Sequence, residues 1–298
     1  MSGKLKEVRE RIKSVVSTQQ ITKAMKMVSA AKLRKAQNAI TEMRPYANRL
    51  DRMLKNILNN LDGDATTSFG VEREVKSVAI VVITSNRGLA GAFNTNIIKA
   101  AIAKIEGEYK PLLDIDKVKI ICIGKKGYDV LKKRYKKDVV NFEYLNLFSD
   151  LTFENIAIVS QFLMDNFENG TFDKIEVCYG QFKNAGIQVP IAVQFLPVAK
   201  IEVDPLVTLP GTKADYLFEP GKVELLEELI PTILQTTFQK FVLDTHASEH
   251  GARMTAMDKA TENAEEMIKN LKINYNKARQ EAITKELSEI VGGAAALG

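Results

Sequence analysis

The sequence MTAMDKATENAEEMIKNLKINYNKARQEA, residues 254–282, decides the fold of this chain. Apolar or small side chains recur in it at alternating intervals of three and four residues, which is the spacing of a coiled-coil seam. Around it, residues 222–297 contain only Pro231 and Gly251 as helix breakers before the terminal Gly292–Gly293, so we expect one helix of about 70 residues, ~105 Å long. A helix of that length exceeds what the core of a 298-residue protein requires. The seam residues are Met254, Met257, Thr261, Ala264, Ile268, Leu271, Tyr275, Ala278 and Ala282.

Residues 4–61 predict a second long helix at the other end of the chain. Its seam begins apolar, turns polar through Ser17–Gln20, and is expected to resume at Ile21, Met25 and Val28. From Leu33 onward the heptad pattern is regular and predicts a left-handed supercoil. Pro45 removes one backbone donor and is expected to bend the helix. The remaining seam residues are Leu5, Val8, Ile12, Val15, Leu33, Ala36, Ile40, Met43, Ala47, Leu50, Leu54, Ile57 and Leu61.

The middle of the chain has a different pattern, in which strands alternate with helices. Val78–Thr84 is a continuous β-branched run, typical of a strand buried on both faces. Further strands are expected at 118–124, 139–144, 174–182 and 187–198, and helices at 95–108, 125–135 and 153–167. The last two strands are joined by a four-residue loop with hairpin chemistry. This predicts an α/β domain with a mostly parallel, Rossmann-like sheet and an antiparallel edge.

The two long helices can pair with each other. The ends of a compact domain usually lie close together on its surface, so the simplest arrangement is an antiparallel two-helix coiled coil rising from the α/β domain. If residue 61 lies opposite 222, residue 4 lies opposite about 279, and about 15–20 residues of the last helix have no partner. We therefore expect an N-terminal coiled-coil helix at 1–61, an α/β domain at 76–205, and a linker with the C-terminal helix and its projecting tip at 206–298.

Composition narrows the function classes. No apolar run is long enough to span a membrane, and the N-terminus lacks the apolar core of a signal peptide. Residues 1–60 hold 14 Lys or Arg and 4 Asp or Glu, so this helix is strongly basic and could meet nucleic acid, anionic lipid or an acidic protein, or simply be solvated. Cys122 and Cys178 lie in strand-like runs and are expected to be buried, reduced thiols.

Two patterns could indicate chemistry. Ser85–Asn94 lies between a buried strand and a helix, where phosphate-binding loops occur, but it matches neither G-x-G-x-x-G nor a P-loop. His246 and His250 share a helix face, but zinc sites need a third ligand and the intervening Glu249 is in the wrong register for H-E-x-x-H. We expect no catalytic, cofactor or metal site on this chain. A nucleotide-dependent enzyme and a basic coiled-coil adaptor for nucleic acid remain the alternatives, the second weakened because residues 1–45 offer no aromatic stacking platform.

Both ends resemble a known family. Residues 18–32, TQQITKAMKMVSAAK, are similar to the N-terminal motif of the gamma subunits of rotary ATP synthases. Residues 275–294, YNKARQEAITKELSEIVGGA, are similar to the C-terminal signature of that family, and 247–257 and 87–94 also fit. The resemblance covers the whole chain.

The resemblance implies a rotor shaft without a catalytic site of its own. The coiled coil and the C-terminal tip would turn inside a ring of three alpha and three beta subunits. The α/β domain would stand outside, bound to the epsilon subunit and to the membrane c ring. Rotation driven by ion flow would carry each beta subunit through its nucleotide states.

The resemblance also assigns contacts residue by residue. Arg87, Gln280 and Thr284 match positions that bond a loop of the beta subunit, and Glu286 lies on the same tip segment. Met25, flanked by Lys23 and Lys26, matches a position facing an acidic segment of beta, so all three residues are expected to contact that subunit. Tyr216 and Glu219 fall in a segment similar to the foot near the c ring.

The resemblance finally bears on redox regulation and location. The chain lacks the cysteine-bearing insertion of chloroplast-type gamma subunits, so Cys122 and Cys178 are not expected to form a redox switch. Without a transit peptide, a bacterial protein is expected, peripheral to the cytoplasmic face of the plasma membrane and binding no nucleic acid.

Overall fold

The computed structural model describes residues 3–59, 68–198 and 222–295. The chain forms two compact units, one of residues 1–31 with 253–298 and the other of residues 32–252. Helix α1 (Gly3–Asn59) and helix α6 (Lys222–Ala295) contribute to both units. Both helices continue through their internal prolines, Pro45 and Pro231. The units are described one at a time.

In the first unit, α6 buries the seam that the heptad pattern predicted. The predicted positions are the covered ones, and from residue 283 to 294 every side chain is exposed. The pairing of the two helices therefore ends after Ala282, in agreement with the about 15–20 unpaired residues that the sequence predicted. Met257, Ala264, Ile268, Leu271 and Ala278 are each at most 9% exposed, and Thr261, Tyr275 and Ala282 are half-buried.

The two helices are antiparallel, in the predicted register. Pairing residue 61 with 222 also places residue 22 opposite 261, and the hydroxyl oxygens of Thr22 and Thr261 are 2.8 Å apart. Farther out, the Arg9 guanidinium donates to the Tyr275 hydroxyl at 2.8 Å, one residue from the predicted partner. A coiled coil between the N- and C-terminal helices is confirmed.

One part of the α1 seam was predicted wrongly. Ile21 and Val28 are each 57% exposed, whereas Thr22 is 8% and Ser29 2% exposed. The seam therefore stays polar through this segment instead of becoming apolar again. The reason is that residues 21–31 carry apolar side chains on two faces, and spacing alone cannot say which face meets α6.

The second unit contains the α/β domain, whose five-stranded sheet has the order β3-β2-β1-β4-β5. The first four strands are parallel, and β5 is antiparallel to β4, as predicted. The sheet belongs to the doubly wound, Rossmann-like class. Its strands are β1 (Val78–Ile83), β2 (Val118–Ile123), β3 (Val140–Asn141), β4 (Lys174–Asn184) and β5 (Ile187–Leu196).

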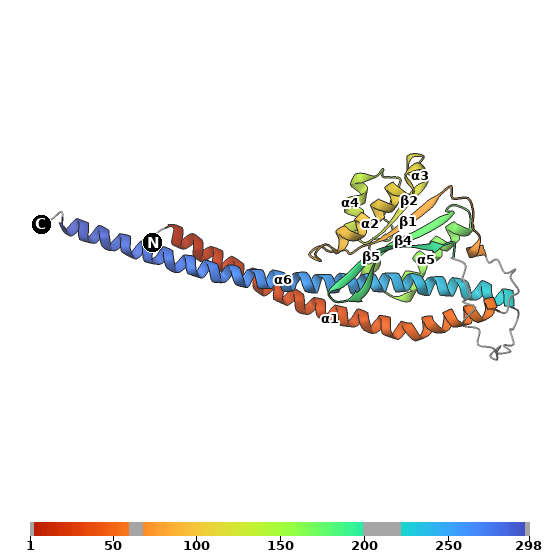
Figure 1. Ribbon diagram of the computed structural model, residues 1–298, viewed down its shortest axis with the longest axis horizontal. Helices are drawn as coiled ribbons and strands as arrows, with labels where there is room; N and C mark the ends of the chain where they lie inside the picture. Colours follow the sequence, from red (N-terminus) through yellow and green to blue (C-terminus); the bar gives the residue numbers. More distant parts are fainter. Residues whose placement is uncertain (1–2, 60–67, 199–221, 296–298) are drawn as a thin grey trace. The chain divides into compact units, whose positions relative to one another are not determined.

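Helices cover both faces of the sheet (Figure 1). In β1, Val78, Ile80 and Val82 pack into a core with α2 (Phe93–Gly107) and α4 (Lys125–Arg134). The alternate residues of β1 pack into a second core with α5 (Phe153–Glu168) and residues 229–242 of α6. Every residue of β1 is fully buried, which explains why its sequence is continuously apolar.

The first part of α6 is built into this second core. Phe238 and Val242 are fully buried there. The Ser248 hydroxyl donates to the carbonyl of Gly180 in β4 at 2.9 Å. At Gly251 a Cβ would lie 3.2 Å from the carbonyl oxygen of Ala185, so the β4–β5 turn packs against the bare backbone of the helix. The first part of this helix therefore belongs to the core of the α/β domain, and its later part is one of the two helices of the coiled coil.

A few elements differ from the sequence prediction. The expected third strand has only two residues, and the β4–β5 loop is two residues long because Asn184 still pairs in the ladder. The Asn184 side chain closes that turn by accepting from the backbone N–H groups of Gly186 and Ile187. Three short helices were not predicted: η1 (Ser68–Gly70), α3 (Lys110–Asp114) and η2 (Leu147–Ser149).

Candidate functional site

The polar segment of the α1–α6 seam holds one of the predicted contact residues. Lys26 extends across the coil and its Nζ lies 2.5 Å from Oδ1 of Asp258. Both side chains are half-buried, with 40% and 45% of their surface exposed. Lys23 is exposed and Met25 is half-buried. Of the two lysines expected to face a partner, the structure points Lys23 outward and pairs Lys26 inside the coil.

The outer face of α1 over the same residues is apolar. Ile21, Met27 and Val28 are 57%, 61% and 57% exposed, and Ala24 and Ala31 are also exposed. These positions share the side of the helix away from the polar seam, so the usual amphipathic pattern is inverted here. Exposed apolar surface of this kind makes the segment a candidate protein contact. The sequence did contain the signal, because the five residues recur at helical spacing, but two of them, Ile21 and Val28, were assigned to the seam.

The end of α6 carries a second exposed apolar surface. Ile283, Leu287, Ile290 and Val291 are each at least 56% exposed and follow one another at intervals of four, three and one, which places them along one stripe of the helix. Gln280, Thr284 and Glu286 are exposed on the same segment. Gln280 lies in line with the stripe, one turn before Thr284, which borders it on one side, whereas Glu286 borders it on the other. The stripe thus has an amide at its start, a hydroxyl at one edge and a carboxylate at the other.

The Ser85–Asn94 loop is held by its own hydrogen bonds. The side-chain Oδ1 of Asn94 accepts from the Ser85 backbone N–H at 2.9 Å, and the Ser85 hydroxyl donates to the backbone carbonyl of Arg87 at 2.6 Å. Leu89 has a left-handed backbone with φ of 62° and is 66% exposed. Arg87 is exposed on this loop, in the second compact unit. The polar groups expected of a phosphate-binding loop therefore serve to shape this turn.

The two histidines of α6 contact each other. Their Nε2 atoms are 3.1 Å apart, within hydrogen-bonding distance, and the His246 ring stacks on Phe148 of η2. Within residues 3–59, 68–198 and 222–295, no cluster of three or more His, Cys, Asp or Glu side chains is arranged to hold a metal ion.

The two cysteines cannot pair with each other. In the sheet register, Cys122 of β2 and Cys178 of β4 both lie beside Val82, on opposite sides of β1. Two strand spacings separate them by ~9.5 Å, beyond the reach of a disulfide. Burial raises the pKa of both thiols to about 12. Both thiols are free and buried, as the sequence predicted.

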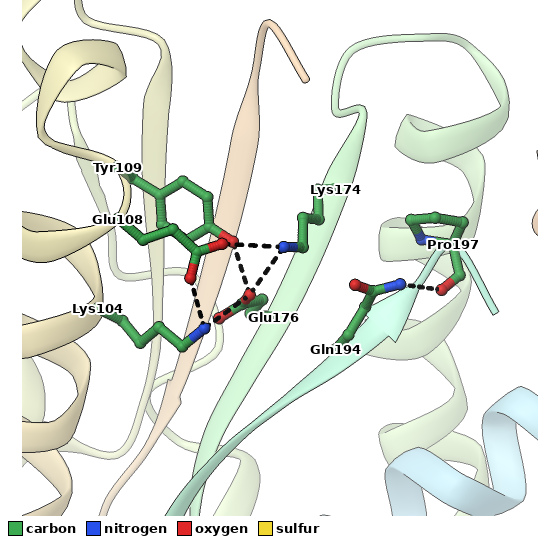
Figure 2. Close-up of polar contacts among 7 residues, drawn as sticks. All are labelled: Lys104, Glu108, Tyr109, Lys174, Glu176, Gln194 and Pro197. Atoms are coloured by element: carbon green, nitrogen blue, oxygen red, sulfur yellow. Dashed lines mark hydrogen bonds and ion pairs between the residues drawn. The ribbon is translucent and has the colours of Figure 1, made fainter. Parts of the chain in front are cut away.

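A cluster of charges that was not predicted lies where α2 ends above β4 (Figure 2). Glu176, only 2% exposed, accepts from the Tyr109 hydroxyl at 2.6 Å and lies 3.3 Å from both Lys104 and Lys174. Lys104 also bonds Glu108 at 2.7 Å and, as the largest cause, lowers the pKa of that carboxyl to about 2. Two cations and two anions thus compensate one another and tie α2 to the sheet, which is a structural role.

The features above define a class: a coiled-coil subunit with apolar outer surfaces, joined to an α/β domain. The profile of the ATP synthase family (ATP-synt) matches residues 4–297. The ATP synthase gamma chains of Cytophaga hutchinsonii and Flavobacterium psychrophilum are each 54% identical to this chain over 293 residues. Each match covers 98% of this chain and 98% of the relative. This chain belongs to the ATP synthase gamma chain family.

Solved structures share the fold. A chain of the mitochondrial ATP synthase of Euglena gracilis, in a structure of OSCP, F1 and c-ring, aligns over 100% of this chain and 95% of its own length with a TM-score of 0.69 and 24% identity. A chain from the central stalk and c-ring structure of Tetrahymena thermophila aligns over 80% of this chain and 99% of its own with a TM-score of 0.54 and 23% identity.

The foot contacts predicted from the sequence, Tyr216 and Glu219, lie outside the described residues. No helix in the described ranges is both long and apolar enough to cross a membrane.

Proposed function

We propose that this chain is the central rotor shaft of an ATP synthase, transmitting torque between a membrane c ring and a catalytic hexamer of three alpha and three beta subunits, and that it carries no catalytic site itself. Membership of the gamma chain family makes it a subunit of that complex. One observation carries the mechanical role: α6 loses its partner after Ala282 and then presents an apolar stripe to solvent. A stripe of four large apolar side chains needs an enclosing partner.

The coiled coil suits the transmission of torque. Two helices packed by heptad knobs resist twisting better than one, because each seam side chain is held in a hole of the facing helix. The inverted segment of α1 adds a second apolar surface, Ile21, Met27 and Val28, on the outside of the pair. Lys23 beside it supplies an outward positive charge, suited to an acidic segment of a beta subunit.

The finer contacts follow from the resemblance. Arg87, Gln280 and Thr284 would bond a loop of beta, with Glu286 on the same tip segment, and Met25 would contribute at the acidic segment. Tyr216 and Glu219 would meet the c ring, and the epsilon subunit would bind the α/β domain. In this proposal the chain is peripheral to the cytoplasmic face of a bacterial plasma membrane, held there through the c ring, and binds no nucleic acid.

The test is reconstitution. The full chain is co-purified with the alpha and beta subunits of its source, and ATPase activity is measured with and without it. We expect a complex with one copy of this chain per three beta subunits, whose ATPase activity depends on the chain. A chain that hydrolyses ATP alone, or that fails to join the hexamer, would refute the proposal.

A variant of the tip makes the test specific. Ile283→Ser combined with Leu287→Ser and Ile290→Ser removes the stripe without touching the chain's own core, since all three side chains are exposed. Each substitution removes up to about 1.5–3 kcal/mol of apolar burial inside the hexamer, so the affinity of the chain for the hexamer should fall tenfold or more. Ile158→Ser is the matched control, because Ile158 is 61% exposed but lies on α5 of the α/β domain. Equal affinities for the tip variant and the control would show that the stripe is not enclosed.

A further inference from the structure

The polar part of the α1–α6 seam contains two pairs of side chains that bond across the helices. Thr22 and Thr261 place their hydroxyl oxygens 2.8 Å apart, and Lys26 contacts Asp258 at 2.5 Å. Thr22 is only 8% exposed, although threonine offers the seam much less apolar surface than leucine. The two pairs follow one another at a spacing of four residues on α1 and three on α6, so they occupy consecutive layers of the coil.

Apolar seams by themselves define the axial register poorly. A shift of one heptad brings each apolar knob to an equivalent hole, so the packing energy changes little. Polar pairs differ, because their hydrogen bonds are satisfied in one register only. In this antiparallel pair, a shift of one heptad would bring Thr22 opposite Met254 or Ile268. Neither side chain can bond the Thr22 hydroxyl, which would then be buried without a partner on the other helix.

The same pair decides which cation faces outward. Lys26 is directed across the coil to Asp258, whereas Lys23, three residues earlier, is exposed. A half-exposed ion pair adds little to stability, so its value lies in specifying one arrangement. Reversing one charge is more disruptive than removing it, because Lys26→Glu would place two carboxylates against each other.

We propose that Thr22–Thr261 and Lys26–Asp258 form a register clamp, which fixes the axial position of α1 against α6. In this assignment Lys26 is a positioning residue inside the coil, and the outward contact of this turn is left to Lys23. The clamp itself is a property of the chain, and only its effect on energy coupling rests on the proposed function as a rotor shaft.

The register is measured directly on the full chain. Spin labels are attached at Glu10→Cys on α1 and Asn274→Cys on α6, both exposed sites, in a background of Cys122→Ser with Cys178→Ser. Slippage by one heptad moves the labels ~10 Å along the helix axis. We expect one narrow distance in the parent, and a broadened or displaced distribution in Lys26→Glu and in Asp258→Lys. The double swap, Lys26→Glu with Asp258→Lys, should return the parent distribution, and Lys23→Glu should leave it unchanged.

Energy coupling is then compared in the assembled complex, as protons pumped per ATP in vesicles. If the clamp acts inside the coil, the double swap recovers the coupling that Lys26→Glu loses. Parent-like distances in both single charge variants would overturn the clamp. A double swap that recovers the distances but not the coupling would overturn the internal assignment of Lys26, since its charge would then be needed by a partner. If the chain forms no complex at all, the proposed function fails while the distance result still decides the clamp.

Discussion

Asp244 gives the sharpest prediction of stability for this chain. It lies on the part of α6 that is packed into the α/β domain and is 6% exposed. Burial raises its pKa from 3.8 to about 6, although the charges of Lys240 and Arg44 favour the ionised form. The carboxyl also contributes to the raised pKa of Tyr179, about 12, whose main cause is burial.

The direction of the pH dependence follows from these two pKa values. The unfolded chain releases the Asp244 proton near pH 3.8, whereas the native chain keeps it to about pH 6. Between these values the native state binds more protons, so stability is highest below the lower pKa and falls as pH rises through the higher one. The difference of about two units corresponds to about 3 kcal/mol of stability that is lost above pH 7.

Asp244→Asn removes this loss because an amide cannot ionise. We expect the variant to exceed the parent by up to about 3 kcal/mol in free energy of unfolding at pH 8, with an advantage about 1.4 kcal/mol smaller at pH 5, one pH unit below the native pKa. Urea unfolding of the full chain, followed by tyrosine circular dichroism, measures both values, since five of the eight tyrosines lie in residues 76–205.

The control is Asp114→Asn, an exposed aspartate at the end of α3, which should change stability little at either pH. If the Asp244→Asn variant shows the same stability difference from the parent at pH 5 and pH 8, the carboxyl does not titrate as a buried group and the reasoning is wrong.

Three further outcomes are expected. Cys122→Ser with Cys178→Ser should leave ATPase activity indifferent to dithiol reductants, and the parent thiols should react with a disulfide reagent only on unfolding, because both are buried; a reductant response in the parent that the variant lacks would show a redox role. Phe238→Ala empties a fully buried ring site and should cost about 3–5 kcal/mol in urea unfolding, and a loss below 1 kcal/mol would contradict the described core. Gly251→Val should destabilise by about 1–3 kcal/mol by pushing the β4–β5 turn away, whereas Gly107→Ala, which meets open space, should not; equal effects on the thermal midpoint would argue against the close packing.

The strands and long helices could be predicted because their signals are local. Val78–Ile83 is apolar throughout, and a strand buried on both faces requires that. The third strand was overestimated, because only Val140 and Asn141 pair with β2 at the sheet edge and the apolar residues after them do not. The helix Lys110–Asp114 was missed because one short turn carries too few residues to show a period.

The contact residues also divide into those that the sequence could locate and those whose contacts depend on folding. Gln280 and Thr284 were expected on the unpaired end of α6; both are exposed, Thr284 beyond the last covered seam residue, Ala282, and Gln280 just before it. Lys26 was expected to contact a beta subunit, which stays a prediction; its bond to Asp258 could not be predicted, because Asp258 is more than 200 positions away and only folding brings the two together. The contact of Arg87 with a beta subunit stays a prediction, as do the contacts of Tyr216 and Glu219 with the c ring.

The sequence by itself determined the class of this protein: two heptad seams at the ends of one chain, an α/β domain between them, and a chain closure that gives the antiparallel register to within one residue. Only the tertiary structure decided which face of α1 is inside between Ile21 and Ala31. Both faces of that segment repeat at helical spacing, and a period measures the angle between side chains without saying where the partner helix lies. The partner supplies Thr261 and Asp258 at this level, so the polar face turns inward to bond them and the apolar face is left outside.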